Sequence, residues 1–133
     1  MTTSLTKQAP AGELAVFEKR LSPEIATLKS GISTIQFDFD TGKIAIGVYA
    51  NSCNTIFNEF IQKLQDHYPE AILKGLYPEH YPLEETQQNF GQEMGALQNA
   101  KANYELDENE FTDETVKLNK RFLAILTREQ ATA

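Results

Sequence analysis

Residues 35–48, IQFDFDTGKIAIGV, carry the most regular hydrophobic pattern in the 133-residue chain. Two runs of alternating apolar and polar residues lie on either side of a central Thr-Gly pair. Alternation with a period of two is typical of a strand that buries one face, and two such runs joined by a short turn are typical of a hairpin. The segment therefore predicts an antiparallel β-hairpin over about 33–49, in which Asp40 faces Lys43 across the turn.

Helical patterns surround this hairpin on both sides. Before and after it, apolar residues recur every three or four positions, which is the spacing of one helix face. Ser22-Pro23 predicts a break between two N-terminal helical segments, and Thr112 is the expected N-cap of the last helix. The apolar stripe of the helix before it extends to Tyr104. The predicted helices cover about 13–29, 54–67, 87–103 and 112–129.

These elements predict an α+β fold, with a small antiparallel sheet built on the hairpin and packed against the helices. Residues 12–133 suit a single α+β domain in size, and residues 1–11 are expected to form a disordered leader. A two-stranded sheet is marginally stable and has two open edges. We therefore expect a third strand at Ala71–Leu76, a homodimer that continues the sheet, or helices that cover the edges, and we favour the homodimer.

The composition argues against several classes of protein. The single cysteine, Cys53, excludes an intrachain disulfide and a cysteine-based metal site. No apolar run approaches the roughly 18 residues of a membrane span, and the N-terminus lacks an apolar signal segment. We therefore expect a cytoplasmic protein that does not bind membranes. The net charge of −7 argues against direct nucleic-acid binding, which needs a surplus of lysine and arginine.

The negative charge is concentrated in residues 84–114. This segment holds nine acidic residues and one basic residue, Lys101, for a charge of −8. Such a segment is most often a solvated helix face, and the alternative is a docking face for a basic partner.

No motif in the chain predicts catalysis. Asp40-Thr41-Gly42 is similar to the triplet of aspartic proteases, but Lys43 follows it where that family has Ala or Ser. A lysine beside two paired carboxylates would favour the ionisation of both and prevent them from sharing a proton. The triplet is better explained as the hairpin turn, so we expect a protein without enzymatic activity and without a cofactor.

His67 and His80 are the candidate metal ligands, together with Glu70, Glu79 and Glu84. Imidazole and carboxylate groups bind zinc and other transition metals. The spacing of these residues matches no metal motif, and a histidine near the C-terminus of a helix is favoured there by the helix dipole alone. A small metal-binding or ligand-binding protein is therefore the alternative hypothesis.

The main hypothesis is a non-catalytic binding or adaptor protein that docks a protein partner with a basic surface. Tyr-Pro occurs three times between residues 68 and 82, and this combination of a rigid backbone with a large side chain suits recognition. A segment of this kind is more often a proline-stiffened crossover whose tyrosines lie over the edge of the core. A third hypothesis is a DNA mimic that inhibits a nucleic-acid-binding protein through rows of carboxylates. The predicted partner-binding residues are Tyr77, His80, Tyr81, Glu84, Glu85, Glu105, Asp107, Glu108 and Glu110.

Overall fold

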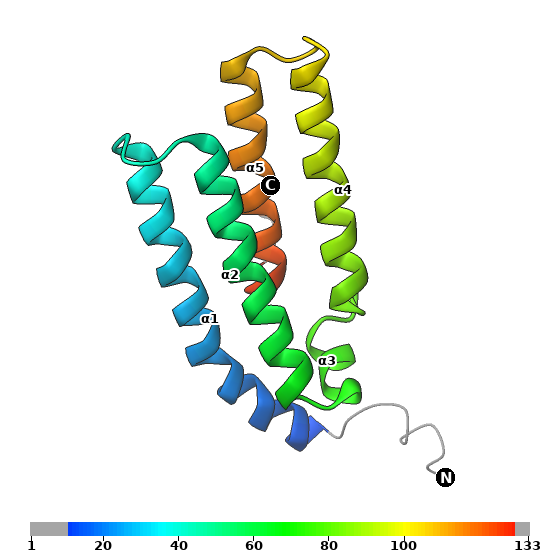
Figure 1. Cartoon of the computed structure of the whole chain (residues 1–133). Helices are drawn as coiled ribbons and strands as arrows, with labels where there is room; N and C mark the ends of the chain where they lie inside the picture. Colours follow the sequence, from blue (N-terminus) through cyan, green and yellow to red (C-terminus); the bar gives the residue numbers. More distant parts are fainter. Residues whose placement is uncertain (1–10, 130–133) are drawn as a thin grey trace.

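The computed structural model describes residues 11–129, and every regular element in that range is a helix. Between residues 11 and 129 five helices follow one another (Figure 1). The leader predicted at residues 1–11 lies outside the described residues except for Ala11, which begins the first helix. The helices are α1 (Ala11–Asp40), α2 (Ile46–His67), α3 (Glu70–Leu76), α4 (Leu83–Ala102) and α5 (Glu108–Leu126).

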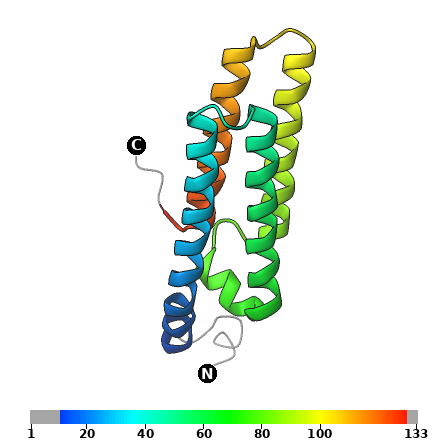
Figure 2. The ribbon, with the colours of Figure 1, turned by 60° about the vertical axis from the view of Figure 1, so that its left-hand side comes forward.

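The long helices form two antiparallel hairpins that pack against each other. α1 and α2 make the first hairpin and α4 and α5 the second, while the short α3 lies at the end where the two hairpins are connected (Figure 1). α2 packs against α5, so these two helices hold the hairpins together. In both views the loop between α4 and α5 extends beyond the loop between α1 and α2 (Figures 1 and 2). One end of the second hairpin therefore projects from the molecule.

The predicted α+β fold is wrong, because residues 11–129 contain no strand. The predicted β-hairpin over 33–49 comprises the last turns of α1, the connection that follows and the first turn of α2. Asp40 does not face Lys43 across a strand ladder; instead Lys43 Nζ lies 3.9 Å from Asp38 Oδ1. Because the described part of the chain has no open strand edge, the argument for a homodimer that continues a sheet no longer applies.

Helical spacing explains why this segment is not a hairpin. Ile32, Ile35 and Phe39 are three and four residues apart and all pack in the core, where the Phe39 ring centroid lies 5.1 Å from that of Tyr49. Phe37, which the alternation would bury on the same face, is 60% exposed. An alternating run of this length always contains apolar pairs at i and i+4, so it fits a helix as well as a strand. The longer pattern along α1 decides between them.

α1 also continues through Ser22-Pro23, where the sequence predicts a break. A proline inside a helix lacks one hydrogen-bond donor and costs about 3 kcal/mol relative to alanine. The helix bends in its N-terminal third (Figure 1), as helices do at proline. Leu21 and Leu28, on either side of the proline, are buried and keep both parts of α1 against the core.

α3 stands where the sequence predicts a third strand at Ala71–Leu76. It buries Ile72 and Leu76 in the core, and their spacing of four residues fits one face of a helix. It also approaches α1 closely, because a Cβ added at Gly75 would lie 2.9 Å from Leu14 Cδ1. The short helix therefore closes one end of the molecule against α1.

Three phenylalanines join α2, α4 and α5 at the centre of the molecule. The rings of Phe90 and Phe122 stack with centroids 4.4 Å apart, and Phe57 meets them edge-on at 5.8 Å and 5.0 Å. All three side chains are at most 4% exposed. Because aromatic pairs add to the stability gained from burial alone, this cluster fixes the positions of α4 and α5.

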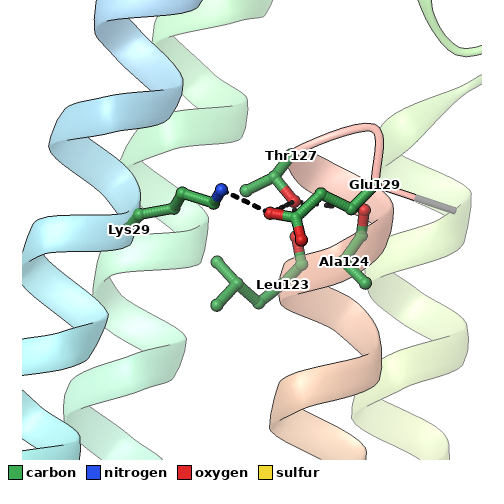
Figure 3. A network of polar contacts seen from close by, with 5 residues as sticks. All are labelled: Lys29, Leu123, Ala124, Thr127 and Glu129. Atoms are coloured by element: carbon green, nitrogen blue, oxygen red, sulfur yellow. Dashed lines mark hydrogen bonds and ion pairs between the residues drawn. The ribbon is translucent and has the colours of Figure 1, made fainter. Parts of the chain in front are cut away.

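The end of α5 is held to the middle of α1. Lys29 Nζ lies 2.6 Å from Glu129 Oε1, and the hydrogen bond from Lys29 lowers the pKa of the Glu129 carboxyl group. The Thr127 hydroxyl lies within hydrogen-bond distance of Leu123 O, Ala124 O and Glu129 Oε1 (Figure 3). It has one proton and therefore donates to one of these oxygens at a time.

Replacing Gly91 and Gly95 of α4 by alanine should stabilise the protein. An added Cβ meets no heavy atom within 4 Å at either position, and alanine is favoured over glycine inside a helix by about 1 kcal/mol. We expect the free energy of unfolding in urea to rise by about 1–2 kcal/mol in the double variant. Gly31→Ala is the control for each single substitution, because its Cβ would lie 3.1 Å from Ile56 Cδ1 and its gain should be smaller than that of Gly91→Ala or Gly95→Ala alone. An equal gain at Gly31 would contradict the close approach of α1 and α2.

Candidate functional site

The projecting end of the α4–α5 hairpin carries a compact group of acidic residues. α4 ends at Ala102, and α5 follows Asp107, whose side chain accepts a 2.8 Å hydrogen bond from Glu110 N. Glu110 Oε1 in turn accepts a 3.0 Å hydrogen bond from Asp107 N. This capping box starts α5 before Thr112, which the sequence predicts as the N-cap. Two of the predicted partner-binding carboxylates therefore also stabilise the start of α5.

Tyr104 lies at this end of the hairpin with 94% of its surface exposed. The prediction that it extends the apolar stripe of α4 is wrong, because the helix ends at Ala102 and Tyr104 has a φ of 60°. The left-handed conformation costs a residue other than glycine about 1–2 kcal/mol. The hydrogen bonds from Tyr104 N to Lys101 O and from Glu105 N to Ala100 O close the end of α4 in this conformation, and Arg128 has nearly the same φ after α5. The exposure of its ring, and not its backbone, therefore makes Tyr104 a candidate contact residue, which the sequence pattern does not reveal.

We define the acidic tip as Tyr104, Glu105, Asp107, Glu108 and Glu110. Its four carboxylates are all exposed. Lys101 Nζ lies 4.0 Å from Glu108 Oε1 and 4.8 Å from the centroid of the Phe111 ring, so it compensates only part of this charge. The tip therefore combines a negative charge with one large aromatic side chain.

The Tyr-Pro segment packs mainly into the core. Tyr68 and Tyr77 are buried. The Tyr77 hydroxyl donates a 2.6 Å hydrogen bond to Leu126 O, and burial raises the pKa of this hydroxyl above its ordinary value. Tyr77 therefore ties the end of α3 to the end of α5. Of the predicted binding residues in this segment, His80 and Tyr81 remain half-buried.

His80 and Tyr81 line a hollow of about 300 Å³ between α4 and α5. The Phe90–Phe122 stack lies beneath it, and Glu85 stands at its edge. Burial raises the pKa of the Tyr81 hydroxyl above its ordinary value. The structure thus brings together three of the nine predicted residues, in a space suited to a single side chain or a small ligand.

A larger hollow of about 860 Å³ lies beside the same loop, against the C-terminal half of α5. Arg121 pairs with Glu93, and Arg128 Nη1 lies 3.0 Å from Glu18 Oε2. Lys120 forms no ion pair with any residue between 11 and 129. These basic residues are visible in the sequence, but they gave no signal of a binding site. Cations in the last turns of a helix are favoured by the helix dipole alone. We define the basic hollow by Tyr77, His80, Lys120, Arg121, Ala124 and Arg128.

The nine predicted residues fall into two separate groups. Glu84 and Glu85 lie in the first turn of α4, beside the Tyr-Pro segment, whereas the acidic tip lies beyond the other end of that helix. α4 has 20 residues, and at 1.5 Å per residue the two groups are about 30 Å apart. The acidic segment 84–114 therefore does not form one compact face.

The alternative metal site gains no support from the geometry. In the described range, no group of three or more histidine, cysteine, aspartate or glutamate side chains could hold a metal ion. His67 is exposed at the C-terminal end of α2, and His80 is half-buried in the loop before α4. The position of each histidine in the fold therefore gives no reason to assign it to a metal site.

Because the Cys53 thiol is buried, we expect the protein to lose stability in alkaline solution. Burial raises the pKa of Cys53 to about 11, against about 8.5 in an unfolded chain. Its contribution is complete below pH 8.5 and is lost as the pH rises toward 11, because the unfolded thiol ionises first. We expect the free energy of unfolding in urea to fall by about 2 kcal/mol between pH 8.5 and 10. In Cys53→Ala the fall just above pH 8.5 should largely disappear, whereas a smaller fall near pH 10 should remain, because burial also raises the pKa of the Tyr49 and Tyr77 hydroxyls. A fall of unchanged size just above pH 8.5 would show that a group other than Cys53 causes it.

Comparisons with protein-family models, curated proteins and solved structures found no match. Within residues 11–129, no helix is both long enough and apolar enough to cross a membrane. The acidic tip, the two hollows and their charges are therefore the observations from which a function can be argued.

Proposed function

We propose that this chain is a non-catalytic cytoplasmic binding protein that docks a partner with a basic surface through the acidic tip. The observation that carries the proposal is Tyr104, which is 94% exposed in a left-handed conformation among exposed carboxylates. Tyrosine is one of the side chains that contribute most binding energy at protein interfaces. Carboxylates around it would attract a basic partner and orient it during the encounter.

The position of the tip supports this proposal. It projects beyond the α1–α2 hairpin in both views, so a partner can reach it without displacing another helix (Figure 2). The capping box between Asp107 and Glu110 fixes part of the tip before any partner binds. A binding surface that is already ordered loses less conformational entropy on association.

Site-specific cross-linking tests the proposal. A photoreactive phenylalanine analogue at position 104, in cells that naturally produce the chain, should give a discrete cross-linked product. Mass spectrometry should identify a partner with a basic surface. The control places the same analogue at Val16, which is 56% exposed in the first turns of α1. α1 begins at the end of the molecule away from the α4–α5 loop (Figure 1). Identical products from both positions would contradict the proposal.

Binding kinetics with the captured partner give the second measurement. The association rate should fall about tenfold between low and physiological salt, because screening weakens charge steering. Glu105→Gln with Glu108→Gln should slow association several-fold, whereas Glu13→Gln with Glu59→Gln, the same charge change at exposed positions of α1 and α2, should not. Tyr104→Ala should mainly speed dissociation. An association rate that does not respond to salt would sink the proposal.

A further inference from the structure

The α4–α5 hairpin is tied to the rest of the molecule at one end. Within residues 11–129, every side-chain hydrogen bond and ion pair that joins it to another part of the chain involves the first two turns of α4, the last turn of α5 or the residues just after α5. These bonds are Thr86–His80, Gln87–Asn58, Tyr77–Leu126, Arg128–Leu76, Arg128–Glu18 and Lys29–Glu129. We call residues 108–119 the tip-side part of α5. In the described range their side-chain bonds stay within the hairpin, so no such bond ties this part to α1 or α2.

The tip-side part of α5 also buries two polar groups that lack a partner. Thr115 and Asn119 are at most 1% exposed, and neither Thr115 Oγ1 nor Asn119 Oδ1 has a hydrogen-bond partner among residues 11–129. The Asn119 amide nitrogen does donate a 2.9 Å hydrogen bond, to Thr115 O. A buried polar atom without a partner costs free energy that contact with water would recover. Parting this section of α5 from its neighbours is therefore less costly than parting a wholly apolar interface.

Cys53 of α2 lies at the same level as these two residues. α2 and α5 both begin at the loop end of the molecule and run in the same direction (Figure 1), and the Phe57 ring meets the Phe122 ring with centroids 5.0 Å apart. Cys53 precedes Phe57 by four residues and Asn119 precedes Phe122 by three, which is about 6 Å and 4.5 Å along each helix. Cys53 is 0% exposed and is the single cysteine of the chain. A gap between α2 and the tip-side part of α5 would expose it.

We propose that the α4–α5 hairpin swings as a rigid arm about the phenylalanine cluster, so that the tip-side part of α5 parts from α2. The bonds at the other end of the arm persist during this motion, and water reaches Thr115 and Asn119 in the open state. Hinge motions of this kind rotate packed elements without unfolding them. The acidic tip lies at the free end of the arm, so each opening moves it away from the α1–α2 hairpin. The proposed function does not require this motion.

The Cys53 thiol provides the test. The purified full chain is treated with an aromatic disulfide reagent, which forms a mixed disulfide with Cys53 and releases a coloured thiolate. If the arm opens, Cys53 should react about tenfold faster, or more, than the population of globally unfolded chain allows. The rate should also depend only weakly on urea, because a hinge opening exposes much less surface than unfolding does.

Thr115→Val should slow this reaction about tenfold, because a methyl group of equal size replaces the unpartnered hydroxyl and stabilises the closed state. Thr115→Ser keeps the hydroxyl and should not slow it. Asn119→Leu removes the other unpartnered group and should slow the reaction as well. Tyr77→Phe is the matched control, because it removes the hydrogen bond to Leu126 O at the end of the arm that stays closed. It should lower the global stability and leave the labelling rate unchanged.

Two results would overturn the inference. A labelling rate that rises with urea as steeply as global unfolding, or that Tyr77→Phe accelerates in proportion to the lost stability, would mean that Cys53 is reached only by unfolding the whole chain. An unchanged rate in both Thr115→Val and Asn119→Leu would mean that α5 does not open at this level. Circular dichroism checks that each variant is folded. Cross-linking at position 104 is independent of this labelling, so the proposed function and the moving arm can each fail alone.

Discussion

Phe122→Ala should lower the free energy of unfolding by about 3–5 kcal/mol, the range found when a buried phenylalanine is truncated. Phe122 is 2% exposed, stacks on Phe90 and meets the edge of Phe57, so its removal opens a cavity where three helices join. A domain of this size is stable by only about 5–15 kcal/mol, so the loss is a large fraction of the total. Urea denaturation followed by circular dichroism measures it.

Phe37→Ala is the matched control for this prediction. The same atoms are removed from a side chain that is 60% exposed, and the change should stay within about 0.5 kcal/mol. The pair also separates the two folds considered for this chain, because a β-hairpin over 33–49 would place Phe37 in the core. Equal losses from both variants would contradict the helical structure.

Pro23→Ala should have the second-largest effect, in the stabilising direction. Proline inside a helix costs about 3 kcal/mol relative to alanine, and its restriction of the unfolded chain returns about 0.4–1 kcal/mol. We therefore expect the free energy of unfolding to rise by about 2 kcal/mol. Thermal and urea denaturation should agree on the sign.

Pro78→Ala is the control for this second variant, because Pro78 lies in the loop between α3 and α4. Pro78→Ala removes no proline from a helix interior, so we expect no comparable rise in the free energy of unfolding. If Pro23→Ala gave no gain either, α1 would be divided at Ser22-Pro23 as the sequence predicts, and the continuous helix would be wrong.

The sequence locates much of the helical structure but misjudges the segment on which its fold class depends. Predicted helical residues 54–67 fall within α2, because five apolar side chains there keep a three–four spacing over about two and a half turns. Residues 35–48 by themselves satisfy both periods, and the exposure of Phe37 shows which of the two the fold uses. That exposure depends on how α1 and α2 pack, which local spacing does not contain. Pro23 also led to a wrong prediction, that of a helix break. Buried residues on either side of it offset the cost of a proline inside the helix.

The residues of the candidate site could also be predicted only in part from the sequence. The acidic residues 105–110 are visible in the sequence, and the structure places them together at one exposed end. The sequence does not reveal that Tyr104 is exposed, because its spacing continues the apolar stripe of α4. The helix in fact stops two residues earlier. Tyr77 is the opposite case, since a recognition-type Tyr-Pro pair proves to be buried and bonded to Leu126 O. Burial and helix ends are tertiary properties, and they decide which tyrosine is free to bind.

The projecting end of the α4–α5 hairpin has one further consequence, which concerns local unfolding. Beyond the α1–α2 loop it is supported by a single helix pair, so its amide hydrogens should exchange by local openings that cost less than global unfolding. Amide hydrogens around the phenylalanine cluster, where α2, α4 and α5 meet, should exchange only through global unfolding. A partner bound to the acidic tip would suppress these local openings. Slower exchange around Tyr104 would therefore report its presence even when the complex is too short-lived to isolate.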